Sequence, residues 1–389
     1  MIPELNKIVK SIPEALSIQI NQIVYDKKSR GERVYTYSLG EAFFDIPRFE
    51  ISDEDWKKGY HYSGSLGQPK LRQKLAEMYK YNYQSPINAE MEVLVSAGSK
   101  PLIFMIFQTI LSAGDEVLVA EPAWLSYKEQ IKLAGGVHIP VPYTKSVYEW
   151  ADYITPRTKA IVINNPNNPS GQLYSREEMT YLVDLARKHN LFILSDEAYS
   201  DFLVRTDTFI SLAQIDKSKE NIIIVNSLSK NMGMSGWRVG YVIAHEQVIK
   251  QILKLNQHLI TCAPTILQDY MAEHFEEILA YTRPQAVAMA EKRKKVCEIL
   301  NNVGIKSLRG VGTFYFLLNV SEYNGTTDEL VEKLLIEHNI AVVSGIAYGE
   351  STKDFVRFGI GVESLENIEK SLKIIKSLLK PSISEAVNG

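Results

Sequence analysis

The sequence has little cysteine, no long apolar run and no excess of charge of one sign. Only Cys262 and Cys297 occur among 389 residues, too few for a disulfide scaffold or a patterned zinc site, which fits a reducing compartment. The formal net charge of −3 offers no electrostatic surface for nucleic acid. No stretch reaches the roughly 18 apolar residues of a membrane span, and residues 1–30 lack the basic-then-apolar order of a signal peptide. We therefore expect a cytoplasmic protein that binds small molecules and is neither secreted nor membrane-spanning.

Apolar and β-branched runs recur along the first two thirds of the chain, with stretches of helical periodicity between several of them. One such stretch, residues 175–189, begins with glutamates and ends with basic residues, as helices do. Continuous apolar strands that alternate with helices predict an α/β fold with a mostly parallel sheet covered on both faces. The predicted strands are residues 93–96, 116–119, 137–141, 160–163, 191–194, 222–225 and 239–243.

The pattern changes after about residue 290. A long charged helix is followed by short predicted strands at 313–320, 341–344 and 355–360, which indicates a second, smaller α+β domain. At this length two domains are expected. We predict an N-terminal arm that contributes to the small domain at 1–45, a large cofactor-binding α/β domain at 46–289, and the small domain at 290–389.

The segment 226–241, N-S-L-S-K-N-M-G-M-S-G-W-R-V-G-Y, carries the most specific chemistry. Lys230 follows a predicted buried strand and enters a glycine-rich turn. A lone lysine there is usually solvated, but a buried one loses its proton more easily and can condense with an aldehyde. Hydroxyl groups at Ser227 and Ser229, Arg238 and the glycine-rich backbone together suit a phosphate. A reactive lysine beside a phosphate site indicates pyridoxal 5′-phosphate.

The pattern S-x-S-K followed by G-W-R-x-G-Y resembles the lysine motif of the fold-type I, class I/II aminotransferases, the aspartate aminotransferase superfamily. The resemblance extends from about residue 38 to residue 375. It implies that Lys230 holds pyridoxal 5′-phosphate as a Schiff base. It also implies ping-pong transfer of the amino group of an L-α-amino acid to a 2-oxo acid.

Ligands of open parallel sheets bind at the carboxyl ends of the strands. Residues 96–102 resemble the family's phosphate-binding turn, which implies that Ser99 and Lys100 contact the phosphate, although glycine and serine before a helix are usually only a cap. Residues 121–127 are similar to the family's P-Y-W-x-S-Y segment. Trp124 would then stack on the pyridine ring, whereas an aromatic side chain at a strand end more often fills core.

Two further strand ends carry polar side chains. Residues 164–171 resemble N-P-x-N-P-T-G, with serine in place of threonine, and imply that Asn168 hydrogen-bonds the cofactor's phenolic oxygen next to a cis Asn168–Pro169 bond. Residues 194–199 resemble the family's D-E-x-Y motif. Asp196 would then hold the ring nitrogen protonated and Tyr199 would donate to the phenolic oxygen. We expect Glu197 to be a solvated or structurally paired acid.

Three more matches concern the partner subunit and the substrate. Tyr62 matches a family tyrosine that reaches the phosphate of the partner subunit, which implies a homodimer with shared active sites. Arg357 lies in an apolar strand and matches the clamp for the substrate α-carboxylate, although alternation alone favours a solvated arginine. Gly40 belongs to the loop 40–47 that lines the substrate mouth in the family. Phe43 in this loop favours apolar or aromatic substrates, since no second cation stands out to read a side-chain carboxylate.

Two other functions stay open at this level. The same residues would serve a pyridoxal-phosphate lyase or synthase, because they form the shared carbanion and do not choose its fate. A non-catalytic regulator on the same fold is the other possibility, which the presence of every matched chemical group disfavours. No metal site is expected.

Overall fold

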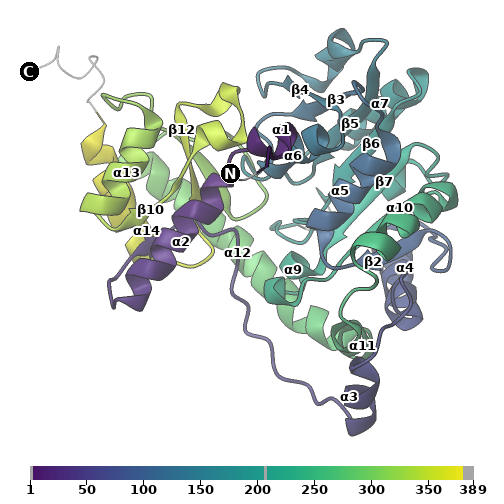
Figure 1. Cartoon of the computed structure of the whole chain (residues 1–389). Coiled ribbons are helices and arrows are strands. Elements are labelled where there is room, and N and C mark those ends of the chain that lie inside the picture. The colour runs from purple at the N-terminus through teal and green to yellow at the C-terminus, as the bar shows by residue number, and fades with distance from the viewer. Residues whose placement is uncertain (1–2, 206–207, 380–389) are drawn as a thin grey trace, which may run out of the picture.

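The computed structural model describes residues 3–205 and 208–379. Residues 1–2 and 380–389, the outer ends of the first and last predicted domains, lie outside the described residues. Figure 1 shows two units side by side: a large one with a central sheet between helices, and a small one built from the C-terminal part and an N-terminal segment. This confirms the predicted α/β fold class, whereas the exact domain boundaries stay a prediction.

The large unit is built on one seven-stranded sheet in the order β2-β8-β7-β6-β5-β3-β4. β8 is antiparallel to both of its neighbours, and all other pairings are parallel. Every predicted strand of this unit is present, with ends shifted by at most two residues. The strands are β2 (Val93–Ser96), β3 (Glu116–Ala120), β4 (Val137–Val141), β5 (Thr158–Asn164), β6 (Phe192–Asp196), β7 (Ile222–Ser227) and β8 (Gly240–Ala244).

Helices cover both faces of this sheet because its strands are apolar on both sides. In β7, Ile222 and Ile224 join the core under α4 (Pro69–Tyr83) and α7 (Arg176–Lys188). Ile223 and Val225 join the core under α5 (Ser99–Ile110) and α10 (Glu246–Leu259). The other helical elements of this unit are α3 (Asp53–Gly59), α6 (Ser126–Leu133), η1 (Val147–Tyr153), α8 (Leu212–Ile215), α9 (Leu228–Asn231), η3 (Ser235–Trp237) and α11 (Thr265–Glu273).

The small unit contains a three-stranded antiparallel sheet, β11-β12-β9, and a two-stranded parallel pair, β1-β10. β1 comes from the N-terminal segment and β10 from the C-terminal part, so the predicted joining of these two segments is present. Two N-terminal helices precede β1, and the second packs on β10 and β11. The first N-terminal helix, α1 (Lys7–Lys10), contacts α6 of the large unit. The elements of the small unit are α2 (Leu16–Ser29), β1 (Tyr35–Thr36), β9 (Tyr315–Asn319), α13 (Thr327–Glu337), β10 (Ile340–Ala341), β11 (Val343–Ser344), η4 (Gly345–Tyr348), η5 (Glu350–Thr352), β12 (Phe355–Gly359) and α14 (Leu365–Leu378).

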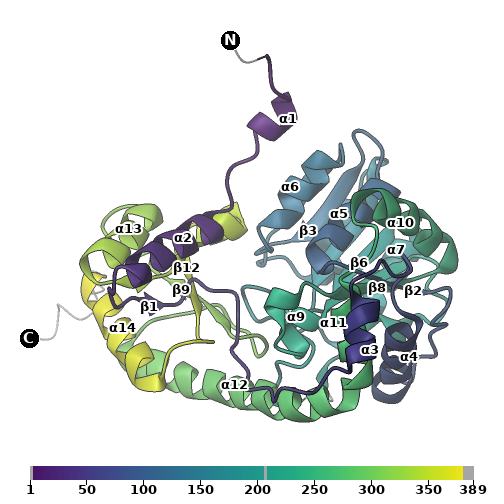
Figure 2. The ribbon, with the colours of Figure 1, turned by 60° about the horizontal axis from the view of Figure 1, so that its bottom comes forward.

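One long helix, α12 (Phe275–Val303), runs from the large unit to the small unit (Figure 2). Phe275 and Ile278 pack in the core of the large unit, whereas Val296 and Leu300 pack in the core of the small unit. The helix begins well before residue 290, where the charged pattern predicted it. Its first half carries fewer charges and contains Pro284, so the charged pattern did not indicate where the helix begins.

The helices of the described residues include none that is both long and apolar enough to cross a membrane.

Glu197, which directly follows β6, is a fully buried acid outside the cavity described below. Its Oε1 accepts hydrogen bonds from the backbone N–H of Leu212, at 3.0 Å, and from the hydroxyl of Ser195, at 3.2 Å. No partner of Oε2 is found among the described residues. Burial is the main cause that raises the pKa of Glu197 to about 7. The acid is therefore structural and buried, not solvated.

This pKa makes stability depend on pH. Between pH 4.5, its ordinary pKa, and about 7, the unfolded chain releases the proton that the folded chain keeps. The contribution of Glu197 to folding therefore falls as pH rises through this window, by roughly 3 kcal/mol in total. Glu197→Gln should flatten this dependence relative to the parent chain in urea unfolding between pH 5 and 8. Glu332→Gln, on the exposed side of α13, is the control and should show the same pH dependence of stability as the parent. The parent's pH dependence in Glu197→Gln as well would contradict the assignment to Glu197.

Candidate active site

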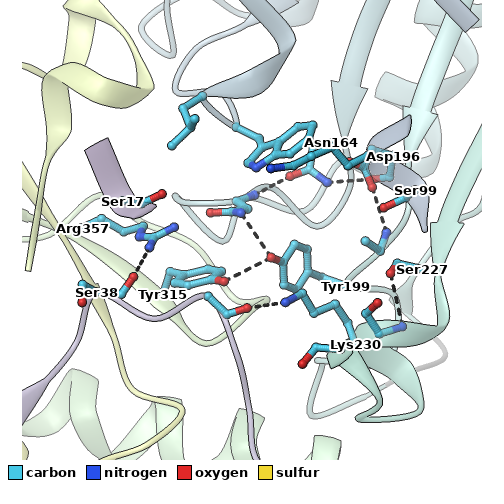
Figure 3. A pocket seen from close by; sticks show the side chains of 18 of the residues that line it. Ser17, Ser38, Ser99, Asn164, Asp196, Tyr199, Ser227, Lys230, Tyr315 and Arg357 are labelled. Atoms are coloured by element: carbon cyan, nitrogen blue, oxygen red, sulfur yellow. Dashed lines mark hydrogen bonds between the residues drawn. The ribbon is translucent and has the colours of Figure 1, made fainter. Parts of the chain in front are cut away.

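A cavity of about 360 Å³ lies at the carboxyl ends of β2, β5, β6 and β7, and residues of α2, β9 and β12 close its other side (Figure 3). It contains eleven of the twelve residues predicted for the site; Tyr62 is the exception. Their roles stay predictions, but the structure brings their side chains to one place. The lining residues are Ser17, Asn21, Ser38, Gly40, Ser99, Lys100, Trp124, Leu125, Asn164, Asn168, Asp196, Ala198, Tyr199, Ser227, Ser229, Lys230, Ser235, Arg238, Tyr315 and Arg357.

Lys230 lies on the one-turn helix α9, immediately after β7. The hydroxyl of Ser227 caps this turn by accepting from the N–H of Ser229. The Lys230 ammonium donates to the carbonyl of Gly40, which links the β7 end to the predicted substrate loop. Burial is the main cause that lowers its pKa to about 8. A substantial fraction of Lys230 is therefore neutral near physiological pH and able to act as a nucleophile or base.

Asp196 ends β6 and is a buried carboxylate, 7% exposed. The phenol of Tyr127 donates to Oδ2 at 2.6 Å and the N–H of Ala198 donates to Oδ1 at 3.2 Å. Burial raises the pKa of Asp196, and no basic side chain of the described residues lies within ion-pair distance of it. A buried acid without a cation suits a protonated ring nitrogen. Sequence reasoning missed Tyr127, one helical turn after Trp124.

Polar side chains converge on the phenol oxygen of Tyr199. Nδ2 of Asn168 donates to it at 3.2 Å, and the hydroxyl of Tyr315 lies at 3.2 Å (Figure 3). Asn168 is held in turn by Asn164, whose Oδ1 accepts from its backbone N–H at 2.6 Å. The Asn168–Pro169 bond is cis, as the motif implied. Oδ1 of Asn168 is buried without a partner among the described residues. Sequence reasoning missed Asn164 and Tyr315.

An anion cradle forms where α5 begins. Gly98 caps this helix with a φ of +97°, and a Cβ there would lie 2.6 Å from Nη2 of Arg238. Only glycine therefore lets the guanidinium approach the free N–H groups of the first turn of α5. Nη1 of Arg238 donates to the hydroxyl of Ser229 at 3.4 Å and to the carbonyl of Ser235 at 2.8 Å. A helix N-terminus, hydroxyl groups and a guanidinium together suit a phosphate.

Arg357 faces the cavity from β12 and is only 4% exposed. Nη2 donates to the carbonyl of Ser38 at 2.6 Å, and Nε has no partner among the described residues. The guanidinium carbon lies 4.7 Å from the ring centroid of Tyr315 and 5.1 Å from that of Tyr348. No carboxylate of the described residues pairs with Arg357. A buried guanidinium in this state suits an anionic ligand.

Lys100 adds a fourth cation to the lining. Its Nζ lies 5.3 Å from the ring centroid of Trp124. Burial, with a smaller effect of Arg238, lowers the pKa of Lys100. Four cations line the cavity: Lys100, Lys230, Arg238 and Arg357. Asp196 is the single carboxylate in the lining. The cavity therefore favours ligands with several negative charges.

Two residues lie outside this cavity. Tyr62 is 86% exposed and does not line the cavity of its own chain, so its predicted contact with the phosphate of a partner subunit stays a prediction. Phe43 is 63% exposed and does not line the cavity either. The expectation that Phe43 supplies apolar surface to a substrate side chain therefore receives no support from this arrangement.

Comparisons with known proteins agree with this arrangement. The model of the family "aminotransferase class I and II" matches residues 51–375. The chain belongs to this family. This aminotransferase is 32% identical to the aspartate aminotransferase of Bacillus sp. (strain YM-2), over 94% of this chain and 98% of the relative. It is 29% identical to the aromatic-amino-acid aminotransferase 2 of Thermococcus litoralis, over 92% and 94%. A solved structure of the Thermus thermophilus aspartate aminotransferase with maleate is similar with a TM-score of 0.87, at 30% identity and covering 97% of this chain and all of the other.

Pyridoxal 5′-phosphate is the cofactor of this family, and the cavity fits it. The buried Asp196 without a cation fits the ring nitrogen, and the unpartnered Oδ1 of Asn168 lies beside the amide nitrogen that would face the phenolic oxygen. The cradle at Gly98 and Arg238 has the hydrogen-bond donors and positive charge that a phosphate needs.

The cradle can be tested with a matched pair of glycines. Gly98→Ala places a methyl group against Arg238, whereas Gly114→Ala places one in open space at a similar φ of +87°. Both should lower stability because of the positive φ, and Gly98→Ala should lower it more, because φ +97° with ψ 164° is open essentially only to glycine. Only Gly98→Ala should also weaken pyridoxal 5′-phosphate binding, about tenfold, as expected for one weakened charge-assisted hydrogen bond. Equal cofactor dissociation constants for the two variants in a fluorescence titration would show that Gly98 does not shape the phosphate site.

Proposed function

We propose that this aminotransferase moves the amino group of an L-α-amino acid with an acidic side chain to a 2-oxo acid in a ping-pong cycle, with its cofactor attached at Lys230. One observation carries the proposal. A partly buried lysine with a lowered pKa lies in a cavity with three further cations and one acid. Such a cavity has separate places for a phosphate, a ring nitrogen and more than one carboxylate.

The chain would hold the cofactor at three points. The N–H groups of the first turn of α5, with Ser99, Ser227 and Arg238, would bind the phosphate. Asp196, supported by Tyr127, would bind the ring nitrogen, and Asn168 and Tyr199 would bind the phenolic oxygen. When bound, the cofactor supplies an electron sink for the negative charge that develops at the substrate Cα. The ring of Trp124, which lines the cavity, would cover the pyridine face.

Lys230 and Arg357 would act on the substrate. The guanidinium of Arg357 binds the α-carboxylate and so orients the Cα–H bond. Nζ of Lys230, which is partly neutral near pH 8 because of burial, accepts the Cα proton and then returns one as an acid. Residues of α2, β9 and β12 line the cavity opposite the strand ends and would bound the space around this proton.

Lys100 would read the side-chain carboxylate. Its ammonium has no carboxylate of the described residues within ion-pair distance, and the ring of Trp124 lies beside it. Several relatives are named aspartate aminotransferases, and the Thermus thermophilus structure is solved with maleate, a dicarboxylate. The Thermococcus litoralis relative is named for aromatic amino acids, so the fold alone does not choose the substrate. The charge balance of the cavity favours the acidic class.

The reaction type can be tested at Lys230. Lys230→Ala should abolish the visible absorbance of the bound cofactor and lower transamination on the order of 10⁴-fold or more, because it removes both the attachment point and the base. Lys250→Ala, exposed on α10, is the control and should behave as the parent. An unchanged spectrum in Lys230→Ala would contradict the assignment.

The parent chain distinguishes amino transfer from elimination or cyclisation. Aspartate alone should release about one equivalent of 2-oxo acid, and a 2-oxo acid should then restore the starting spectrum. Ammonia release without this cycle would favour the lyase.

The substrate class can be tested at Lys100. Lys100→Met should lower kcat/KM for aspartate about 10- to 100-fold, because a hydrogen bond to a charged group is lost, and should change kcat/KM for leucine and phenylalanine little. Lys128→Met, exposed on α6, serves as control. An equal loss for all donors with weaker cofactor binding would assign Lys100 to the phosphate instead. A parent chain that prefers phenylalanine to aspartate would refute the acidic class.

The homodimer and the cytoplasmic location stay predictions. Tyr62 is exposed and so accessible to a second chain. We propose that Tyr62 of the partner subunit completes the phosphate site, and the molar mass measured by light scattering tests whether the chain pairs.

A further inference from the structure

Arg293, in the middle of α12, is a buried arginine that does not line the cavity. It is 3% exposed, and burial lowers its pKa to about 10. Its guanidinium donates only to backbone carbonyls, and no carboxylate of the described residues forms an ion pair with it. A guanidinium is costly to bury, so an arginine bound in this way is expected to hold something specific.

The carbonyls come from two segments that are far apart in the sequence. Arg293 donates to the carbonyl of Ser170, at 3.5 Å, in the turn that carries Asn168. It also donates to the carbonyl of Gly310, at 3.1 Å, and to that of Tyr315, in the segment that leads into β9. One side chain of the connecting helix therefore holds a loop of the large unit and a strand of the small unit.

The two segments also contact each other directly. The N–H groups of Val311 and Gly312 donate to the carbonyl of Gly171, at 2.8 and 2.9 Å. A Cβ at Gly171 would lie 2.7 Å from Nη2 of Arg293 and 2.5 Å from the carbonyl oxygen of Gly312. At this position, with a φ of +76°, a glycine is needed for the approach. The guanidinium and the paired backbones form one interlocked contact.

Each of the two segments carries a side chain that contacts the phenol oxygen of Tyr199. Asn168 comes two residues before Ser170 and donates to the phenol oxygen of Tyr199, and Tyr315, whose carbonyl Arg293 holds, places its hydroxyl 3.2 Å from that oxygen (Figure 3). The ring of Tyr315 also lies under Arg357. The position of Arg293 is therefore coupled to the hydrogen bonds around Tyr199 without touching the cavity.

We propose that Arg293 is a positioning residue that clamps the 168–171 turn to the start of β9 and so fixes Asn168 and Tyr315 against the Tyr199 hydroxyl. The inference rests on the proposed function, because Asn168 and Tyr199 are the groups that would hold the phenolic oxygen of the cofactor.

Lys292, the preceding residue of α12, offers a matched control. It is also a largely buried cation that donates only to backbone carbonyls, those of Ile360 at 2.7 Å and Glu363 at 2.5 Å. Burial lowers its pKa as well. Neither carbonyl belongs to a residue that contacts Tyr199. Loss of Lys292 should therefore disturb the small unit and leave the hydrogen bonds of Asn168 and Tyr315 in place.

The experiment compares Arg293→Lys, Arg293→Met and Lys292→Met as holoenzymes with pyridoxal 5′-phosphate. Arg293→Lys should shift the midpoint of the pH titration of the cofactor's visible absorbance by about half a pH unit or more, because weakened hydrogen bonds at the phenolic oxygen affect its two protonation states unequally. It should also lower kcat about tenfold, less than the roughly hundredfold loss from a 1 Å misplacement. Arg293→Met should shift the midpoint further.

Lys292→Met should lower thermal stability with an unshifted midpoint. A parental midpoint in both Arg293 variants, or an equal shift in Lys292→Met, would overturn the proposal.

Should the Arg293 variants not fold, the parent chain still provides a test. Cofactor binding should slow hydrogen exchange of the Val311 and Gly312 amides, which the clamp ties to the 168–171 turn. The Ile305 amide, bonded to the carbonyl of Leu300, should be unaffected. Amide exchange at residues 311 and 312 that is equally fast with and without the cofactor would contradict the proposed role of Arg293. Failure of the parent chain to bind the cofactor at Lys230 would instead reject the proposed function.

Discussion

The excess of positive charge in one cavity is the constraint on which the rest of the site depends. Four cations and one carboxylate share a space of about 360 Å³. Like charges repel, and the repulsion is strongest at Arg357, the one buried cation of the four, because water screens the others in part. Desolvation is the main cause that lowers the pKa values of Lys230 and Lys100, and the neighbouring guanidinium groups add to it. A phosphate and substrate carboxylates, the ligands that we propose, would supply negative charge to this lining.

The sheet explains why these groups can be held so close together. Strands β5, β6 and β7 are parallel neighbours, so the polar residues after them meet at one edge. Their N-terminal parts are packed on both faces by helices, which leaves the strand ends little freedom. The small unit then adds Arg357 from β12, and the N-terminal segment adds Gly40 from the loop after β1, to the lining of the cavity. The positions of these groups depend on how the two units are joined, and α12 with Arg293 forms one such junction.

The sequence predicted residues of the cavity where a polar side chain directly follows a strand. Asp196, Asn168 and Lys230 each follow an apolar run, and parallel strands bring such residues together whatever the rest of the fold does. Tyr315 and Arg293 could not be found in this way. Tyr315 lies within an apolar strand like any core aromatic residue, and Arg293 lies in a charged helix where arginines are normally solvated. Their surroundings arise only when segments more than a hundred residues apart pack together.

Other expectations depended on packing that the sequence does not show. Phe43 stood in a loop whose conformation no local pattern determines, and its side chain faces solvent. The start of α12 was placed too late because charge, the feature used to find the helix, is concentrated in its second half. Lys100 was recognised as a site residue, but its place beside Trp124 is a tertiary relation between two helices and two strand ends. Periodicity therefore predicted elements and strand ends, whereas distances between side chains required the folded chain.

The pairing of β1 with β10 has a consequence for the order in which the chain can mature. Tyr35 lies opposite Ile340, so the first strand of the small unit has no partner until most of the polypeptide has left the ribosome. At about 5–20 residues per second, the wait for the roughly 300 intervening residues is about 15–60 s. During that time the large unit can complete its sheet, whose strands all lie between residues 93 and 244. The strands of the large sheet are therefore all synthesised before β1 can pair with β10, and the N-terminal segment is among the last parts of the chain to pack.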